Sequence, residues 1–260
     1  MLISTILFGC YDNQEACLDP EATNFDPEAD KSCCCTYPQL KLDVVYQYDT
    51  LTFSENQSFE HDIHGQISVI DFGLIFHSFS LSDNIDTFPV TDTRSFWISE
   101  GTDSSMMMLT DDFILFGDRF NYTVGTFVPI GGFKQMIIST GLSDQQNRIL
   151  PATLQNHPLA TLDQRGYWDS LSGYEEAFIK LAYGTDLGDT TLWTSGTSGF
   201  DSNVELDVEV TKVLGRDLEI ELEFDLKCWL GEIDFTRPKN EITEALLESF
   251  ASNDCLKIRD

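Results

Sequence analysis

The only close pair among the four histidines of the sequence is His61 and His64, which are separated by two residues and flanked by Glu60 and Asp62. Imidazole nitrogens at this spacing can reach one borderline metal ion. The alternative is a short polar turn that contains two histidines and binds no ligand. His77 lies inside an apolar run, and we expect it to be a hydrogen-bonded histidine of the core or of a sheet edge.

Three consecutive methionines, Met106 to Met108, provide thioethers, which are the ligands that suit Cu(I). In a strand, however, successive side chains point to opposite faces, so three neighbours cannot converge on one ion. The sequence therefore predicts that these methionines pack in the core.

Oxygen ligands are concentrated near the N-terminus, in the acidic segment 11–38. Asp19, Asn24, Asp26 and Asp30 are closely spaced and have the oxygen atoms that Ca²⁺ prefers, although they do not follow the EF-hand spacing. They are the candidate calcium ligands. The alternative is an acidic spacer in which the Asp-Pro steps make turns.

The first ten residues, 1–10, form an apolar run that ends in Gly9-Cys10. This run resembles the hydrophobic region and lipobox of a bacterial lipoprotein signal, with Cys10 as the acylated residue. Two features depart from the pattern: no Lys or Arg precedes the run, and Phe8 stands where a small residue is usual. The alternative is a buried N-terminal strand.

If Cys10 carries lipid, an even number of cysteines remains: Cys17, Cys33, Cys34, Cys35, Cys228 and Cys255. In an exported chain an even remainder indicates disulfides. We expect Cys17 to pair with one of the three cysteines at 33–35, and Cys228 to pair with Cys255. A soft-metal thiolate cluster at 33–35 is the alternative.

The charge balance is strongly acidic, with 44 Asp and Glu against 15 Lys and Arg and a formal net charge of −29. Such a chain repels nucleic-acid phosphates and anionic lipid headgroups, so direct binding to nucleic acid is excluded. The charge favours a cation or a basic partner; the alternative is solubility in a saline environment. The hydrophobic fraction of 42% is ample for a core.

The elements that would position these residues are mainly strands. From Leu40 onward, short runs alternate between apolar and polar residues and are separated by Gly and Asp clusters. They predict an all-β fold, an antiparallel β-sandwich of the Greek-key type. The segments 204–210 and 218–226 predict an antiparallel hairpin with one acidic face, and 241–250 predicts a short C-terminal helix with Asn240 as N-cap.

Residues 136–184 resemble the MbnP-like family. The segment contains His157-Pro-Leu159 and then Gly166-Tyr-Trp-Asp-Ser-Leu-Ser-Gly-Tyr174, similar to the family's Pro-Leu step and Trp-x-Trp-x-x-Gly-Tyr motif. The resemblance extends over roughly 40–250. The chain is therefore expected to have three parts: the lipoprotein signal at 1–10, the acidic Cys-rich module at 11–38, which resembles Asp-Pro modules of Bacteroidota surface proteins, and an MbnP-like β domain at 39–260.

The resemblance also implies copper binding and a dihaem peroxidase-like partner. The candidate copper ligands are His61, His64, His157 and Trp168. The sequence departs from the family pattern at Ser170, which replaces the second Trp, and after Gly184, where the expected histidine is absent.

The chain contains no nucleophile elbow, phosphate-binding loop, dinucleotide fingerprint or zinc-protease helix, so we expect a non-enzymatic protein. The first hypothesis is a lipid-anchored outer-membrane or surface protein that binds, or helps to acquire, a metal ion such as copper or calcium. The second is an accessory lipoprotein docked on an outer-membrane β-barrel complex.

Overall fold

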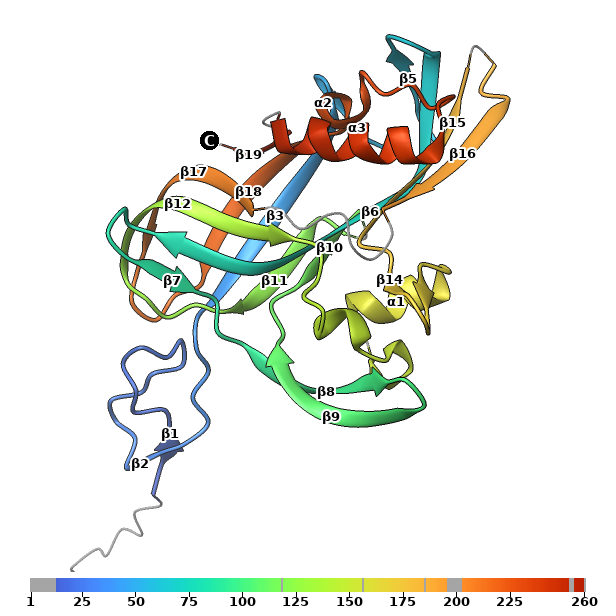
Figure 1. The fold of residues 1–260 in the computed structure, drawn as a ribbon. Helices are drawn as coiled ribbons and strands as arrows, with labels where there is room; N and C mark the ends of the chain where they lie inside the picture. The colour runs from blue at the N-terminus through green and yellow to red at the C-terminus, as the bar shows by residue number, and fades with distance from the viewer. Residues whose placement is uncertain are drawn as a thin grey trace, which may run out of the picture.

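The computed structural model of the chain is a two-sheet sandwich with a small module at its N-terminal end (Figure 1). The structure describes residues 13–117, 119–155, 157–184, 186–195, 203–252 and 255–259, without the side chains of 247, 251 and 252. The candidate lipidation site Cys10 lies outside the described residues.

The larger sheet is organised around one long strand, β6 (Gly65–Ser82), which pairs along its length with most of the other strands. Its main path runs β16-β15-β6-β12-β17, and three short strands also pair with β6. All its described pairs are antiparallel. The other strands are β5 (Ser58–His61), β7 (Thr87–Pro89), β10 (Ile114–Phe116), β12 (Gly131–Thr140), β15 (Ala177–Tyr183), β16 (Asp189–Thr194) and β17 (Asn203–Lys212).

The second sheet runs β11-β3-β18-β19, with β4 also paired to β3. Its pairs are antiparallel except for β3 and β18, which are parallel. The strands are β3 (Gln39–Tyr48), β4 (Leu51–Thr52), β11 (Asn121–Thr126), β18 (Leu218–Asp225) and β19 (Leu256–Ile258). The predicted mostly antiparallel β-sandwich is confirmed.

The central strands of the larger sheet bury both faces, which produces two hydrophobic cores. On β6, Phe72, Leu74 and Phe76 point into the main core between the two sheets. Ile75 points the other way, into a second core with Phe178 of β15. Since successive side chains of a strand face opposite sides, a run without polar positions marks a strand that is covered on both faces.

The second core is covered by a two-stranded ribbon and by short helical segments. The ribbon is the hairpin β8 (Thr93–Glu100) and β9 (Asp103–Thr110), which pair only with each other among the named strands. It curves along the lower side of the molecule in Figure 1, opposite the C-terminal helix. The helical segments and the small hairpin beside them are η1 (Gln146–Arg148), η2 (Pro151–Thr153), α1 (Pro158–Gln164), β13 (Trp168–Asp169) and β14 (Gly173–Tyr174).

The predicted hairpin of the two acidic strands is wrong. β17 pairs with β12 in the larger sheet, whereas β18 pairs with β3 and β19 in the second sheet. The chain therefore crosses from one sheet to the other between them, and both apolar faces line the same core. The alternation of apolar and polar residues predicts which face of each strand is buried, but it does not indicate which strand lies next to it in the sheet.

The C-terminal helix is confirmed as α3 (Lys239–Ser252). It begins just after Pro238, so Asn240 lies inside the helix and is not its N-cap. Ile242 and Leu246 are buried against the main core. The short helix α2 (Leu226–Leu230) precedes it and is joined to the start of β19 by the disulfide Cys228–Cys255. Within the described residues, no helix is both long and apolar enough to cross a membrane.

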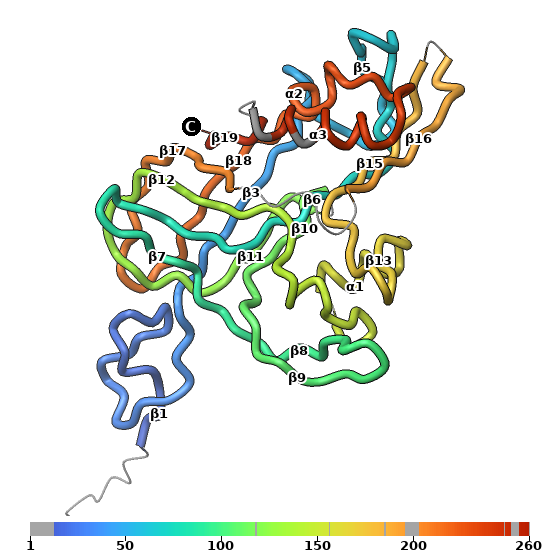
Figure 2. The backbone as a smooth tube through the Cα atoms, viewed as in Figure 1, coloured from blue at the N-terminus to red at the C-terminus, as the bar shows by residue number. Residues whose placement is uncertain are grey.

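The N-terminal module is held by the disulfide Cys17–Cys35 and by the parallel pair β1 (Glu15–Ala16) and β2 (Lys31–Ser32). Figure 2 traces the backbone from this module directly into β3. Both predicted disulfide pairings are therefore present, and Cys33 and Cys34 are not bridged. Because Cys35 is in a disulfide, the structure does not contain the alternative thiolate cluster at 33–35.

Candidate functional site

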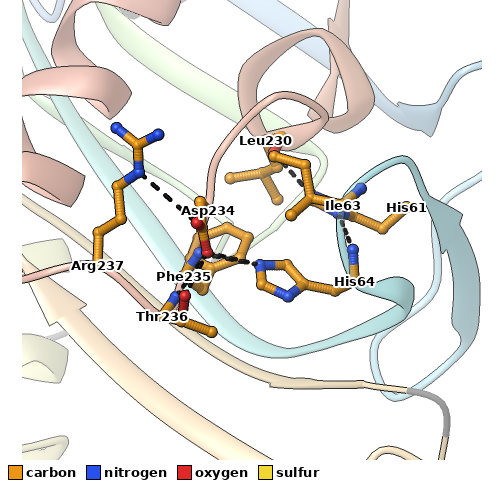
Figure 3. A network of polar contacts seen from close by, with 8 residues as sticks. All are labelled: His61, Ile63, His64, Leu230, Asp234, Phe235, Thr236 and Arg237. Carbon is orange, nitrogen blue, oxygen red and sulfur yellow. Dashed lines mark hydrogen bonds and ion pairs between the residues drawn. The ribbon is translucent and has the colours of Figure 1, made fainter.

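His61 and His64 lie together at the end of β5, where both rings are held by backbone groups (Figure 3). The Nδ1 of His61 accepts the N–H groups of Ile63 and His64, both at 3.2 Å, and its Nε2 lies 3.0 Å from the carbonyl of Leu230. Because Nδ1 accepts, the proton of the neutral ring is on Nε2 and is donated to Leu230. His61 is only 3% exposed, and burial lowers the pKa of its imidazole.

His64 continues the same network toward the loop between α2 and α3. Its Nε2 accepts the N–H of Phe235 at 2.9 Å and lies 3.7 Å from the carboxylate of Asp234. The His61 and His64 ring centroids are 5.1 Å apart, and the ring of Tyr183 lies 4.9 Å from that of His64. The two histidines thus fasten the β5–β6 turn to the loop that follows α2.

His157 and Trp168 lie elsewhere, beside the second core. His157 caps α1 through Nδ1, which accepts the N–H of Leu159 at 3.2 Å, and its Nε2 lies 3.2 Å from Asp111. Trp168 is half-buried against the second core, with its ring 6.3 Å from that of Tyr174.

The four predicted copper residues thus divide into the pair His61 and His64, beside the main core, and the residues His157 and Trp168, beside the second core. Among the described residues, no group of three or more His, Cys, Asp or Glu is arranged to hold a metal ion.

The predicted calcium ligands take part in hydrogen bonds that shape the N-terminal module. Asp19 accepts from the N–H of Glu21 and the hydroxyl of Tyr37. Asn24 bonds to the backbone of Cys34 and Thr36.

Asp26 and Asp30 are brought together by one residue, Gln14. Its side-chain amide donates to Asp26 and its backbone N–H donates to Asp30. Asp26 also accepts the N–H of Glu28. These contacts are the turn-forming role that the Asp-Pro steps indicated as the alternative; the calcium site stays a prediction.

The methionine prediction is wrong for two of the three residues. Met106 and Met108 are 60% and 69% exposed, whereas Met107 is partly buried against the second core. Alternation in β9 places Met106 and Met108 on one face. Trp97, which is 41% exposed, lies directly across the strand from Met106. The sequence showed the alternation, but not that the ribbon covers the second core with only one of its faces.

This outer face of the β8–β9 ribbon, which we call the ribbon face, contains no charged side chain. The register pairs the outward residues of β8 with those of β9, and none is acidic although the chain has a net charge of −29. The ribbon face consists of Thr93, Ser95, Trp97, Ser99, Ser104, Met106, Met108 and Thr110.

A buried carboxylate, Asp112, follows the ribbon. It is 2% exposed, and its Oδ1 has no hydrogen-bond partner among the described residues. Burial raises the pKa of this carboxyl to about 6, although backbone N–H groups of Ser78 and Phe79 partly oppose the shift. Asp112 is therefore a destabilising charge at neutral pH.

A search of solved structures matches MbnP from Methylosinus trichosporium, with a TM-score of 0.43 and 13% sequence identity over 75% of this chain and 78% of that chain. No family model and no curated protein matches the chain. The predicted resemblance is thus confirmed only as a distant structural similarity, and we draw no function from it.

Proposed function

We propose that the chain is a non-enzymatic, lipid-anchored extracytoplasmic protein that binds a soft monovalent metal ion, Cu(I), on its ribbon face. The observation that carries the proposal is the exposure of Met106 and Met108 on one face of β9, with Trp97 across from Met106. The metal prediction is kept in this proposal, but its ligands differ from the four residues that the sequence indicated.

The donor set of the ribbon face fits Cu(I). Thioether sulfur is a soft, neutral ligand that selects Cu(I) over hard cations such as Ca²⁺ and Mg²⁺. The methionine side chain has three rotatable bonds, so two methionines on the same face of a strand can turn their sulfur atoms toward one ion. The indole of Trp97 offers a π face to the resulting cation.

The cysteines support the extracytoplasmic location in this proposal. Two disulfides, Cys17–Cys35 and Cys228–Cys255, are typical of a chain that folds in an oxidising compartment. Together with the lipobox-like segment that ends at Cys10, they support an exported lipoprotein.

In cells that express the full chain, we expect the wild type in the membrane fraction and Cys10→Ser in the soluble fraction. Equal partition of the two proteins would contradict the anchor.

The metal proposal is tested by titrating the full chain with Ag(I), a redox-inert substitute for Cu(I), while following tryptophan fluorescence. The thiols of Cys33 and Cys34 are first alkylated, because free thiolates also bind soft metals. We expect one ion per chain and at least a tenfold loss of affinity, about 1.4 kcal/mol, in Met106→Leu/Met108→Leu.

The matched control is Met107→Leu, which makes the same chemical change on the opposite face of the same strand. It should bind Ag(I) as the wild type does. Equal affinity of the double variant and the wild type would overturn the proposal.

A further inference from the structure

A groove lies between the tip of the β8–β9 ribbon and the β13–β14 turn. It consists of two adjoining hollows of about 520 and 650 Å³. These volumes are in the range of small-molecule binding sites, about 300–1,000 Å³. The two hollows are continuous because they share Ser99, Gly101, Thr102, Ser170 and Leu171 as lining residues.

One wall of the groove, the turn at 169–173, is held in a fixed shape. The Oδ1 of Asp169 accepts the N–H groups of Leu171 and Ser172 and the hydroxyl of Ser172, and these bonds lower the pKa of the Asp169 carboxyl. Gly173 has φ of +88°, and a Cβ there would meet the side chain of Asn147 at 2.6 Å. The wall is therefore formed before any ligand arrives.

The other wall of the groove is the tip of the β8–β9 ribbon, which is hydrogen-bonded to η1. The guanidinium of Arg148 donates from Nε and Nη2 to the carbonyl of Ser99, at 2.8 and 2.6 Å. The Oδ1 of Asn147 accepts the N–H of Tyr174 at 2.7 Å. These bonds join η1 to both the ribbon and the β13–β14 hairpin, so the width of the groove is set by the fold.

The lining combines an aromatic ring with many small polar side chains. Trp168, which is half-buried, supplies the aromatic surface. Leu171, which is 96% exposed, lines both hollows. The hydroxyls of Ser99, Thr102 and Ser170 and the second carboxylate oxygen of Asp169 supply donors and acceptors.

We propose that this groove binds an oligosaccharide. A sugar ring presents an apolar C–H face that can stack on the indole of Trp168 and a rim of hydroxyls that pair with serine and threonine side chains. The volume of each hollow, about 520 and 650 Å³, leaves room for more than one sugar ring. Polyanions are disfavoured by the net charge of −29, since Arg148 is the one basic residue that lines either hollow.

The test is a glycan array probed with the labelled full chain, followed by titration of the bound glycans monitored by calorimetry. We expect binding of at least one oligosaccharide of three or more units with a dissociation constant of about 1 mM or tighter. Ser170→Arg, which places a bulky charged side chain in the groove, should weaken binding at least tenfold.

Three further variants keep the result interpretable. Trp168→Phe retains the packing against the second core and should weaken binding severalfold without lowering the melting temperature by more than a few degrees. Leu171→Ala, in the groove, should also weaken binding, and Leu214→Ala, at an exposed leucine of the β17–β18 turn, is its matched control and should bind as the wild type does. An array without any bound glycan, or a Ser170→Arg protein that binds as tightly as the wild type, would overturn the proposal. Ag(I) binding to the ribbon face is an independent property of the chain.

Discussion

The His61 and His64 network and the ribbon face both contain side chains that can ligate metals, but they differ in what surrounds them. Both ring nitrogens of His61, and Nε2 of His64, are engaged by backbone groups of the β5–β6 turn, of α2 and of the loop that follows α2. On the ribbon face, Met106 and Met108 are largely exposed to solvent. The first region therefore serves the fold, whereas the second is available to a ligand.

The difference shows why residue type alone is a weak guide to a metal site. Histidine is the more common ligand, and a spacing of two intervening residues suggested one here. Yet a metal bound through Nδ1 of His61 would take the acceptor from two backbone N–H groups, and a metal bound through Nε2 would take the donor hydrogen bond from the carbonyl of Leu230. An unsatisfied polar group costs about 1–3 kcal/mol when it is buried. Binding at exposed thioethers carries no such cost.

The largest expected effect is the loss of stability when the network is broken. In His61→Leu, the N–H groups of Ile63 and His64 lose their acceptor, and the carbonyl of Leu230 keeps only the N–H of Ile233. We expect the free energy of unfolding to fall by about 3 kcal/mol, measured by urea denaturation. Met108→Ser, on the exposed ribbon face, should change it by no more than about 0.5 kcal/mol. If both variants lost a similar amount of unfolding free energy, the claim that the histidine network serves the fold and the ribbon face does not would be contradicted.

A second effect distinguishes two buried titrating groups by the sign of the pH dependence that each gives to the free energy of unfolding. His61 has a lowered pKa in the folded state, so the unfolded chain binds more protons and stability is lost as the pH falls below about 6.5. Asp112 has a raised pKa of about 6 against 3.8 in the unfolded chain. The folded state then binds more protons, and stability is lost as the pH rises from about 4 to about 6.

The substitution Asp112→Asn removes the pH dependence of stability that Asp112 causes and leaves the one that His61 causes. Relative to wild type, we expect this variant to gain stability between pH 4 and pH 7, by about 3 kcal/mol at most for a shift of this size. Urea denaturation of both proteins at several pH values measures the difference. A difference that does not change with pH would mean that the buried carboxyl titrates normally.

The sequence predicted the fold class well because burial leaves a periodic pattern. Alternation identified the strands at 204–210 and 218–226 and their buried faces, and the apolar face of α3 at Ile242 and Leu246. The same pattern could not say which strands are neighbours, because pairing depends on the crossing of the chain between sheets. The error in the predicted hairpin has this origin.

The candidate site was only partly predictable. Pairing of Cys17 with one of three cysteines followed from chain proximity, but the choice of Cys35 depends on the geometry of the module. The sequence shows Met106 and Met108 as soft ligands but predicts that they are buried, because methionine is usually a core residue and local composition does not reveal which face of a strand is exposed to solvent. The groove at Trp168 joins 99–104, 147–148 and 168–173, which no local pattern connects.

The most direct test of the soft-metal assignment is methyl NMR of the full chain labelled with ¹³C at the methionine methyl groups, during addition of Ag(I) to thiol-alkylated protein. We predict that the signals of Met106 and Met108, assigned with the single Leu variants, shift together and saturate at one ion per chain. The signals of Met107 and of the buried Met136 should stay in place. Saturation of the fluorescence change without any shift of the Met106 and Met108 signals would contradict the account.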